Sequence, residues 1–153
     1  MKPSEQILSG QDYLSNITVN ATAKESFDKI SRVGEWWSKS FKGKSQRPGD
    51  TFSVRFGETS VDFKIDEVIP DKKIVWEVTG CNLHWIENKT EWKGTKIAWE
   101  VSSENSKTKI SMTHVGLVPG VECYNDCKIG WNFHIQESLF KLLTENKGLP
   151  DQG

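Results

Sequence analysis

The sequence predicts an α+β domain in which a curved antiparallel sheet wraps around one long C-terminal helix. Three observations lead to this fold class. Segments with alternating apolar residues follow one another through the middle of the chain, with short turns between them. A capped helical segment follows the first such strand. The last third of the chain has the pattern of a helix that is apolar on two sides, and such a helix needs a covering layer.

The chain is expected to begin with a strand and two short helices. Residues 16–21 alternate between polar and apolar side chains, which predicts the first strand. Thr22 and Glu25 then form a capping-box signature, in which each side chain satisfies a free amide at the start of a helix. Gly34 is expected to divide the helical segment, which places two adjacent tryptophans in a second, shorter helix near the mouth of a cavity.

Five further strands are expected to form an antiparallel meander, because their connections are short and polar. Their inward-facing positions are Phe52, Val54 and Phe56; Val61, Phe63 and Ile65; Ile74, Trp76 and Val78; Ile97, Trp99 and Val101; and Ile110, Met112 and His114. The segment 80–93 fits neither helix nor strand. It is interpreted as an extended excursion anchored by Trp85 and Trp92.

The last helix is expected to run from about Val121 to Asn146, with Gly148 as its C-terminal cap. One stripe of its surface is formed by Tyr124, Trp131, Ile135, Leu139 and Leu142. A second stripe, nearly opposite, is formed by Ile129, Phe133 and Phe140. One stripe should pack on the sheet, and the other should face a cavity, the short helices or a partner subunit.

Short motifs are placed along this framework. They are Trp36-Trp37, the segments 47–52 (RPGDTF), 94–97 (GTKI) and 114–119 (HVGLVP), Glu122-Cys123-Tyr124, Cys127, Gly130-Trp131 and Ser138-Leu139. Together they make residues 15–148 resemble the START-like (SRPBCC) helix-grip superfamily. Within it, the chain looks like the branch related to the C-terminal domain of the heat-shock-protein-90 ATPase activator.

This resemblance implies a seven-stranded sheet around the long helix, one strand more than the alternation predicts, and an internal hydrophobic cavity. It implies the fold better than the function, because the superfamily hosts lipid carriers, hormone binders, cyclases and chaperone regulators.

Length and composition restrict the organisation of the protein. A chain of 153 residues fits one domain, expected at 15–148, with a short polar segment at 1–14 and a tail at 149–153. The net charge of −1 argues against nucleic acid and anionic membranes as partners. The chain has no membrane-spanning apolar run, and its polar start lacks a signal-peptide centre, so a cytoplasmic location with reduced thiols is expected.

The seven tryptophans favour an aromatic ligand pocket, although core packing is the simpler interpretation of each one alone. Parity and helix stripe place a set of large side chains between the sheet and the last helix. The expected ligand-binding residues are Trp37, Phe41, Phe63, Trp76, Trp99, Met112, His114, Trp131 and His134. His134 is the expected polar anchor, and His114 should be buried because it shares strand parity with Met112.

Cys123 and Cys127 lie one helical turn apart, and with His114 they could supply three zinc ligands. A structural zinc site needs four, and only Cys81 and His84 remain as candidates. We therefore expect no metal, no cofactor and no obligatory disulfide, because two cysteines in one helical turn rarely reach disulfide geometry.

Three functions from different classes follow. The leading one is non-enzymatic binding of a small hydrophobic or aromatic ligand in an internal cavity, by a monomer or homodimer. The resemblance implies a second, regulation of a heat-shock-protein-90-type chaperone ATPase as its partner. The third is a cavity enzyme of the polyketide cyclase or dehydratase kind, using His114 or His134 as acid or base, although no catalytic residue is assigned.

Overall fold

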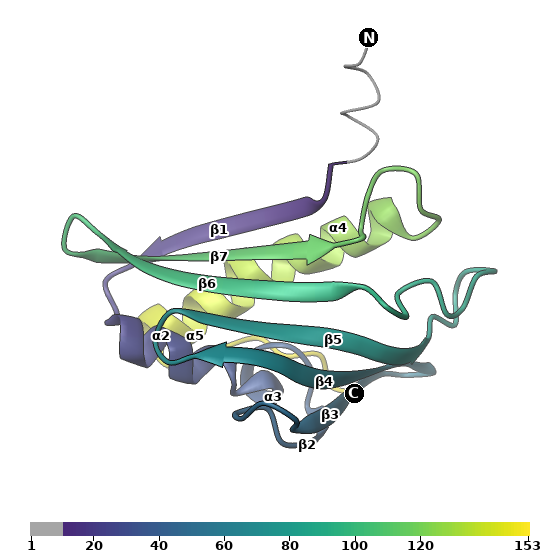
Figure 1. The fold of residues 1–153 in the computed structure, drawn as a ribbon, viewed down its shortest axis with the longest axis horizontal. Helices are drawn as coiled ribbons and strands as arrows, with labels where there is room; N and C mark the ends of the chain where they lie inside the picture. The colour runs from purple at the N-terminus through teal and green to yellow at the C-terminus, as the bar shows by residue number, and fades with distance from the viewer. Residues whose placement is uncertain (1–10) are drawn as a thin grey trace, which may run out of the picture.

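The computed structural model describes residues 11–153, whose seven antiparallel strands form one sheet curved around a long helical segment (Figure 1). The strands are β1 (Tyr13–Val19), β2 (Ser40–Gly43), β3 (Thr51–Phe56), β4 (Thr59–Ile69), β5 (Lys73–Asn82), β6 (Lys96–Glu104) and β7 (Lys107–Val115). Their order in the sheet is β1-β7-β6-β5-β4-β3-β2. The predicted α+β class and the meander from β3 to β7 are confirmed.

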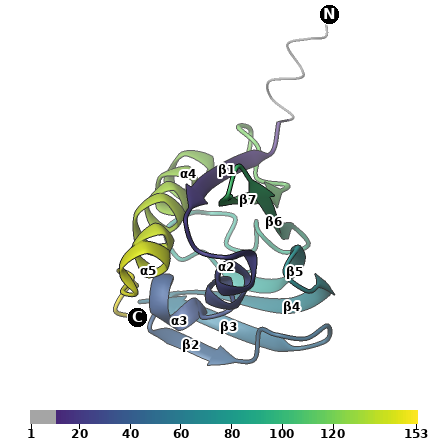
Figure 2. The same ribbon diagram turned by 90° about the vertical axis from the view of Figure 1, so that its left-hand side faces the viewer.

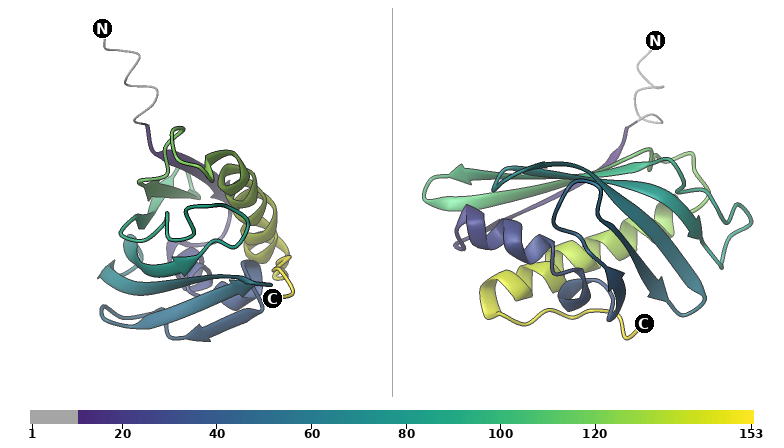
Figure 3. Two further views of the ribbon diagram at one scale, coloured as in Figure 1. Left: turned by 90° about the vertical axis from the view of Figure 1, so that its right-hand side faces the viewer. Right: turned by 60° about the horizontal axis from the view of Figure 1, so that its bottom comes forward.

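The helices lie on the concave side of the sheet, and the sheet curls around them (Figure 2). Two short ones, α2 (Ala23–Ile30) and α3 (Val33–Trp36), follow β1. The C-terminal segment consists of α4 (Tyr124–Phe133), a π-helical turn η1 (His134–Leu139) and α5 (Phe140–Glu145). In the oblique view it crosses beneath the strands from end to end (Figure 3). No helix within residues 11–153 has the length and apolar character needed to cross a bilayer.

The predicted capping box at the start of α2 is confirmed. The backbone amide of Glu25 donates to the Thr22 hydroxyl at 3.0 Å, and the amide of Thr22 donates to the Glu25 carboxylate at 2.9 Å. These two hydrogen bonds satisfy amides that a helix start otherwise leaves free, so they fix where the chain turns from β1 into the helical layer.

The sheet differs from the alternation pattern at both of its edges. β1 begins at Tyr13, earlier than the expected 16–21, and pairs along its whole length with β7. The seventh strand is β2, which pairs Phe41 with Val54 of β3. Its four residues are too few to show an alternating pattern, so only the family resemblance implied it. Most of the expected N-terminal segment, 1–14, lies outside the described residues.

The end of the long helix differs from the expectation. Asn146, not Gly148, adopts the left-handed conformation that caps α5, with a φ of 62°. Asparagine tolerates this conformation better than most residues, which explains why a glycine is not needed there. Gly148 instead is buried against the backbone of α3, where a Cβ would lie 3.2 Å from the Cα of Trp36 and would collide with the carbonyl oxygen of Glu35.

We therefore expect Gly148→Ala to destabilise the protein by about 1–3 kcal/mol, because neither backbone segment can move without disturbing the core. Urea unfolding measures the effect. Gly120→Ala is the matched control, since nothing lies within 4 Å of its added Cβ. Equal stabilities of the two variants would contradict the close backbone approach.

The C-terminal residues fasten the segment that follows α3. The Ser138 hydroxyl donates to the carbonyl of Trp36 at 2.6 Å and accepts from the amide of Leu149 at 2.7 Å. The amide of Asp151 donates to the carbonyl of Trp37 at 2.9 Å, and the carbonyl of Asp151 accepts from the amide of Lys39 at 2.8 Å. These contacts hold the backbone around Trp37 in place, and so fix the direction of its indole.

The two stripes of the long helix have different environments. Most of the first stripe is buried against the sheet, including Trp131, Ile135 and Leu139. The second stripe faces solvent in the single chain, with Ile129 68%, Phe133 43% and Phe140 36% exposed. The expectation that it packs on a cavity or on the short helices is therefore wrong. A partner subunit is the remaining alternative of the three.

Candidate functional site

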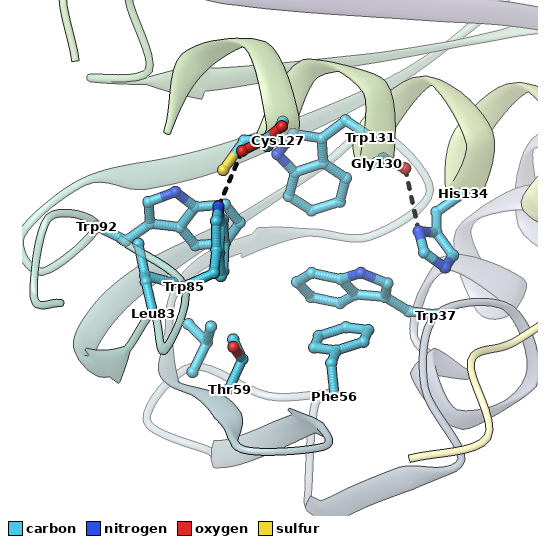
Figure 4. A pocket seen from close by; sticks show the side chains of 12 residues that line it. Trp37, Phe56, Thr59, Leu83, Trp85, Trp92, Cys127, Gly130, Trp131 and His134 are labelled. Carbon is cyan, nitrogen blue, oxygen red and sulfur yellow. Dashed lines mark hydrogen bonds between the residues drawn. The ribbon is translucent and has the colours of Figure 1, made fainter. Parts of the chain in front are cut away.

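A pocket of about 270 Å³ opens where the N-terminal half of the long helix separates from the sheet (Figure 4). Its walls come from α4, from the β3–β4 hairpin, from the loop after β5 and from the segment after α3. The lining residues are Trp37, Phe56, Thr59, Val61, Leu83, Trp85, Trp92, Asp126, Cys127, Gly130, Trp131 and His134. Most of these side chains are apolar, and five of them are aromatic rings of Trp or Phe.

The aromatic rings form a continuous wall. Trp131 lies at its centre, stacked on Trp37 with centroids 4.8 Å apart and on Trp92 with centroids 6.0 Å apart. Phe56 continues the wall, and its ring centroid lies 5.6 Å from that of Trp37. Trp85 stands opposite on its loop, 47% exposed, and Figure 4 shows the rings surrounding an open space. Such a wall offers flat apolar faces to a bound molecule.

Trp37, Trp131 and His134 are the predicted site residues that line this pocket. Four others, Phe63, Trp76, Trp99 and Met112, are fully buried and packed in the core between sheet and helix. Phe41 is half-buried on β2, where it packs against Phe52, and His114 lies behind Trp131. Strand parity identifies inward-facing side chains, but it does not say at which end of the sheet the helix leaves room.

Sequence reasoning missed the hairpin and loop residues of the site. Trp85 and Trp92 were recognised only as anchors of an irregular segment, yet both line the pocket. Two features of the sequence indicate these residues. A pair of tryptophans in a segment without regular structure is unusual. Cys127 and Gly130 are spaced so that they share one face of the helix with His134, which is a predicted site residue.

His114 is fully buried beside α4, as predicted, and its hydrogen bonds define its protonation. The Trp131 indole can only donate, so its 3.1 Å contact leaves Nδ1 of His114 unprotonated. Nε2 then carries the proton and donates to the Thr95 hydroxyl at 2.9 Å, which donates to the carbonyl of Trp92 at 2.6 Å. Burial lowers the pKa of His114 to about 3. The imidazole is therefore neutral, and its hydrogen bond holds the Trp131 indole in position from behind the aromatic wall.

His134 has one ring nitrogen that can accept a hydrogen bond at the edge of the pocket. Its Nδ1 lies 3.0 Å from the carbonyl oxygen of Gly130, which can only accept, so Nδ1 carries the proton (Figure 4). Burial lowers the pKa of His134, which favours the neutral ring with a free lone pair on Nε2. His134 is also the first residue of the π-helical turn, a feature often found at functional sites.

The two helical cysteines behave as small apolar groups. Cys123 accepts a hydrogen bond from the Trp92 indole at 3.3 Å. A side-chain hydrogen bond with Cys123 and burial raise the pKa of the Cys127 thiol, so it stays protonated and is a poor nucleophile or metal ligand. Within the described residues, no three His, Cys, Asp or Glu side chains are grouped as metal ligands, and both nitrogens of His114 are already engaged.

Carboxylates hold the loop after β5 against the start of α4. Glu91 belongs to the loop, and its carboxylate accepts from the backbone amides of Glu122 and Cys123 at 2.7 and 2.9 Å. Glu122 in turn accepts from the loop amides of Glu87 and Asn88 at 2.9 and 3.0 Å. The loop that carries two walls of the pocket is therefore attached by reciprocal charged hydrogen bonds.

We expect Glu122→Ala to loosen this loop, so that the amides of Glu87 and Asn88 exchange with solvent severalfold faster. Hydrogen exchange with mass spectrometry on a peptide covering 83–93 measures the change. The hydrogen bonds from Asn88 and Glu87 lower the pKa of Glu122. The attachment should thus be complete above its unfolded pKa near 4.5 and be lost as pH falls through its lower folded pKa. Glu137→Ala, an exposed change on the same helical segment, should leave the loop protected.

Comparison with known families and structures agrees with this architecture. The sequence profile of the family described as "Activator of Hsp90 ATPase homolog 1-like protein" matches residues 25–144. No curated protein matches the sequence. Among solved structures, the Aha1 dimer from Colwellia psychrerythraea is similar at 22% identity and a TM-score of 0.75, covering 90% of this chain and 99% of that one.

Two further structures share the fold. Protein MLL2253 from Mesorhizobium loti is 14% identical with a TM-score of 0.71, over 91% of this chain and all of the other. DynU16, from the dynemicin biosynthetic locus, is 18% identical with a TM-score of 0.67, over 90% of this chain and 48% of the other. At these identities the likeness concerns the fold alone.

Proposed function

This chain belongs to the family of Activator of Hsp90 ATPase homolog 1-like proteins, and from that premise we propose that it is a non-enzymatic binding protein for a small hydrophobic or aromatic molecule. The observation that carries the proposal is the aromatic-walled pocket of about 270 Å³ beside α4. Concave apolar sites with few polar groups are the usual form of small-molecule sites.

The size and walls of the pocket suit a compact, flat ligand. Its volume lies just below the ~300 Å³ at which pockets for drug-sized ligands begin, so one or two fused rings fit better than a lipid chain. Burying roughly 200 Å² of apolar surface would contribute about 5 kcal/mol before the cost of association, which suits a reversible carrier or sensor.

The polar groups near the pocket support binding rather than catalysis. His114 is walled off behind Trp131, and the thiol of Cys127 is held protonated. Of the described residues, His134 alone lines the pocket with an imidazole. A cavity enzyme of the cyclase kind would need a second group to complete proton transfer with it, and the carboxylate of Asp126 on the same wall is held at the rim by the Trp85 indole.

Filling the pocket tests the proposal. Gly130 lies on its wall, and a Cβ added there meets nothing within 4 Å. Gly130→Leu should therefore plug the pocket without strain, and leucine is the better helix former. We expect calorimetric titration with 2-naphthol to show binding to the wild-type protein and none to Gly130→Leu. Asn125→Leu, on the exposed side of α4, is the control that should bind normally. Equal binding by all three proteins would refute the pocket as the site.

A second candidate function is regulation of a chaperone ATPase, favoured by the family and by the solvent-facing row Ile129, Phe133 and Phe140 on the long helix. Exposed apolar rows of this kind mark protein contacts. The test is the ATPase rate of purified Hsp90 with the wild-type chain and with Phe133→Ser. A rate change with the wild type that the variant abolishes would support this function. Sedimentation of the chain alone would show whether the same row joins two copies.

A further inference from the structure

Most of the indole N–H donors on the pocket wall are already engaged. Three of its four indole N–H groups are already used inside the protein. Trp85 donates to the Asp126 carboxylate at 2.9 Å, Trp92 donates to Cys123, and Trp131 donates to His114. The Trp37 N–H and the Thr59 hydroxyl are the donors left on the wall. A ligand that is itself an anion, such as a carboxylate or phosphate, would find only these two neutral donors and no cationic side chain among the described lining residues.

The acceptors that remain carry negative charge or a free lone pair. Asp126 uses one carboxylate oxygen for Trp85, and its second oxygen has no hydrogen bond among the described residues. Nε2 of His134 is unprotonated, as its contact with Gly130 requires. Among residues 11–153, no lysine or arginine lines the pocket. In the neighbouring loop, Lys89 is turned to the carbonyls of His84 and Ile86 at 3.0 and 2.9 Å.

Five aromatic rings of Trp37, Phe56, Trp85, Trp92 and Trp131 surround this acceptor-lined space. The face of an indole carries partial negative charge, and a cation placed over it is attracted, most strongly where water is excluded. Quaternary and tertiary ammonium groups disperse their charge over alkyl carbons, so they are the cations that aromatic cages take most readily. Aromatic faces and a carboxylate at the rim thus favour the same kind of ligand.

We infer that the pocket selects a small organic cation, an ammonium group carried on a flat hydrophobic frame, over neutral and anionic molecules of the same shape. This inference rests on the proposed function of the pocket and names the charge class of its ligand. The cage rings contact the ammonium group, and the Asp126 carboxylate at the rim supplies the counter-charge.

A pair of isosteric probes tests the inference. The 4-hydroxyphenyltrimethylammonium ion and 4-tert-butylphenol have the same shape and differ by one charge. Calorimetric titration of the wild-type protein should give roughly tenfold tighter binding of the ammonium probe, as expected for a partly desolvated cation–π site. Equal or tighter binding of the neutral probe would overturn the inference while leaving the proposed pocket intact. Binding of neither probe would refute both.

Removing the rim charge provides the second arm. Asp126→Asn keeps an oxygen that can accept from Trp85 but removes the negative charge. The ratio of the two affinities should fall severalfold in this variant. Glu137→Gln is the matched control, because it removes a charge from the same helical segment outside the pocket. Equal ratios in the wild type and in Asp126→Asn would remove the carboxylate from the proposal.

Discussion

Replacing Trp131 with alanine is expected to cost about 3–5 kcal/mol of unfolding free energy and to abolish ligand binding. The indole is 2% exposed and stacks on two other tryptophans, so its removal leaves a large void. It also donates to Nδ1 of His114, and its loss would leave that buried nitrogen without a partner, which adds about 1–3 kcal/mol. Urea unfolding and 2-naphthol titration measure the two effects.

Trp85→Ala separates binding from stability in the same pocket. Trp85 is 47% exposed, and apart from its hydrogen bond to Asp126 it adds little to the core. We expect its loss to change stability by less than about 1 kcal/mol while it weakens binding of the aromatic probe. A Trp131→Ala protein as stable as Trp85→Ala would show that the stacked wall does not support the fold.

Acidification from pH 7 to pH 5 is expected to lower the unfolding free energy by about 2 kcal/mol through His114 alone. Its pKa is about 3 in the folded protein against 6.5 for the free group. The unfolded chain therefore binds the proton first, so stability is complete above pH 6.5 and declines as pH falls toward 3. The lowered pKa of His134 acts in the same direction. Full protonation in the core would cost roughly 5 kcal/mol.

Urea unfolding at a series of pH values measures this slope. His114→Asn should remove most of the slope between pH 7 and pH 5, whatever its stability at pH 7, and leave the part that His134 contributes. Asn125→Leu, an exposed change on α4, is the control that should keep the wild-type slope. A slope in His114→Asn as steep as that of the wild type would mean that another group carries the acid sensitivity.

Local sequence patterns predicted most of the strands of this fold and the start of its first helix. The meander from β3 to β7 followed from alternation, and the start of α2 followed from the Thr22–Glu25 capping box, because both depend on neighbours in sequence. β2 could not be found in this way. Its four residues form a strand only because β3 offers them an edge, which is a tertiary effect.

The pocket depends on tertiary effects as well. Trp76 and Trp99 have the same inward parity as a pocket residue would have, yet Trp37 and Trp36 pack on them and they are fully buried. Trp85 and Trp92 lie in a segment without periodicity, and they reach the pocket only because Glu91 and Glu122 attach their loop to α4. No residue pattern along the chain reports such a contact.

The most direct measurement of the proposed binding site is the response of the seven indole N–H signals in a two-dimensional NMR spectrum. Titration with 2-naphthol should shift the signals of Trp85, Trp92 and Trp131, which line the pocket, and leave that of the core residue Trp99 in place. The shifts should disappear in Gly130→Leu. Shifts at Trp99 in place of the lining residues, or no shift at any indole, would contradict the ligand-binding role of the pocket.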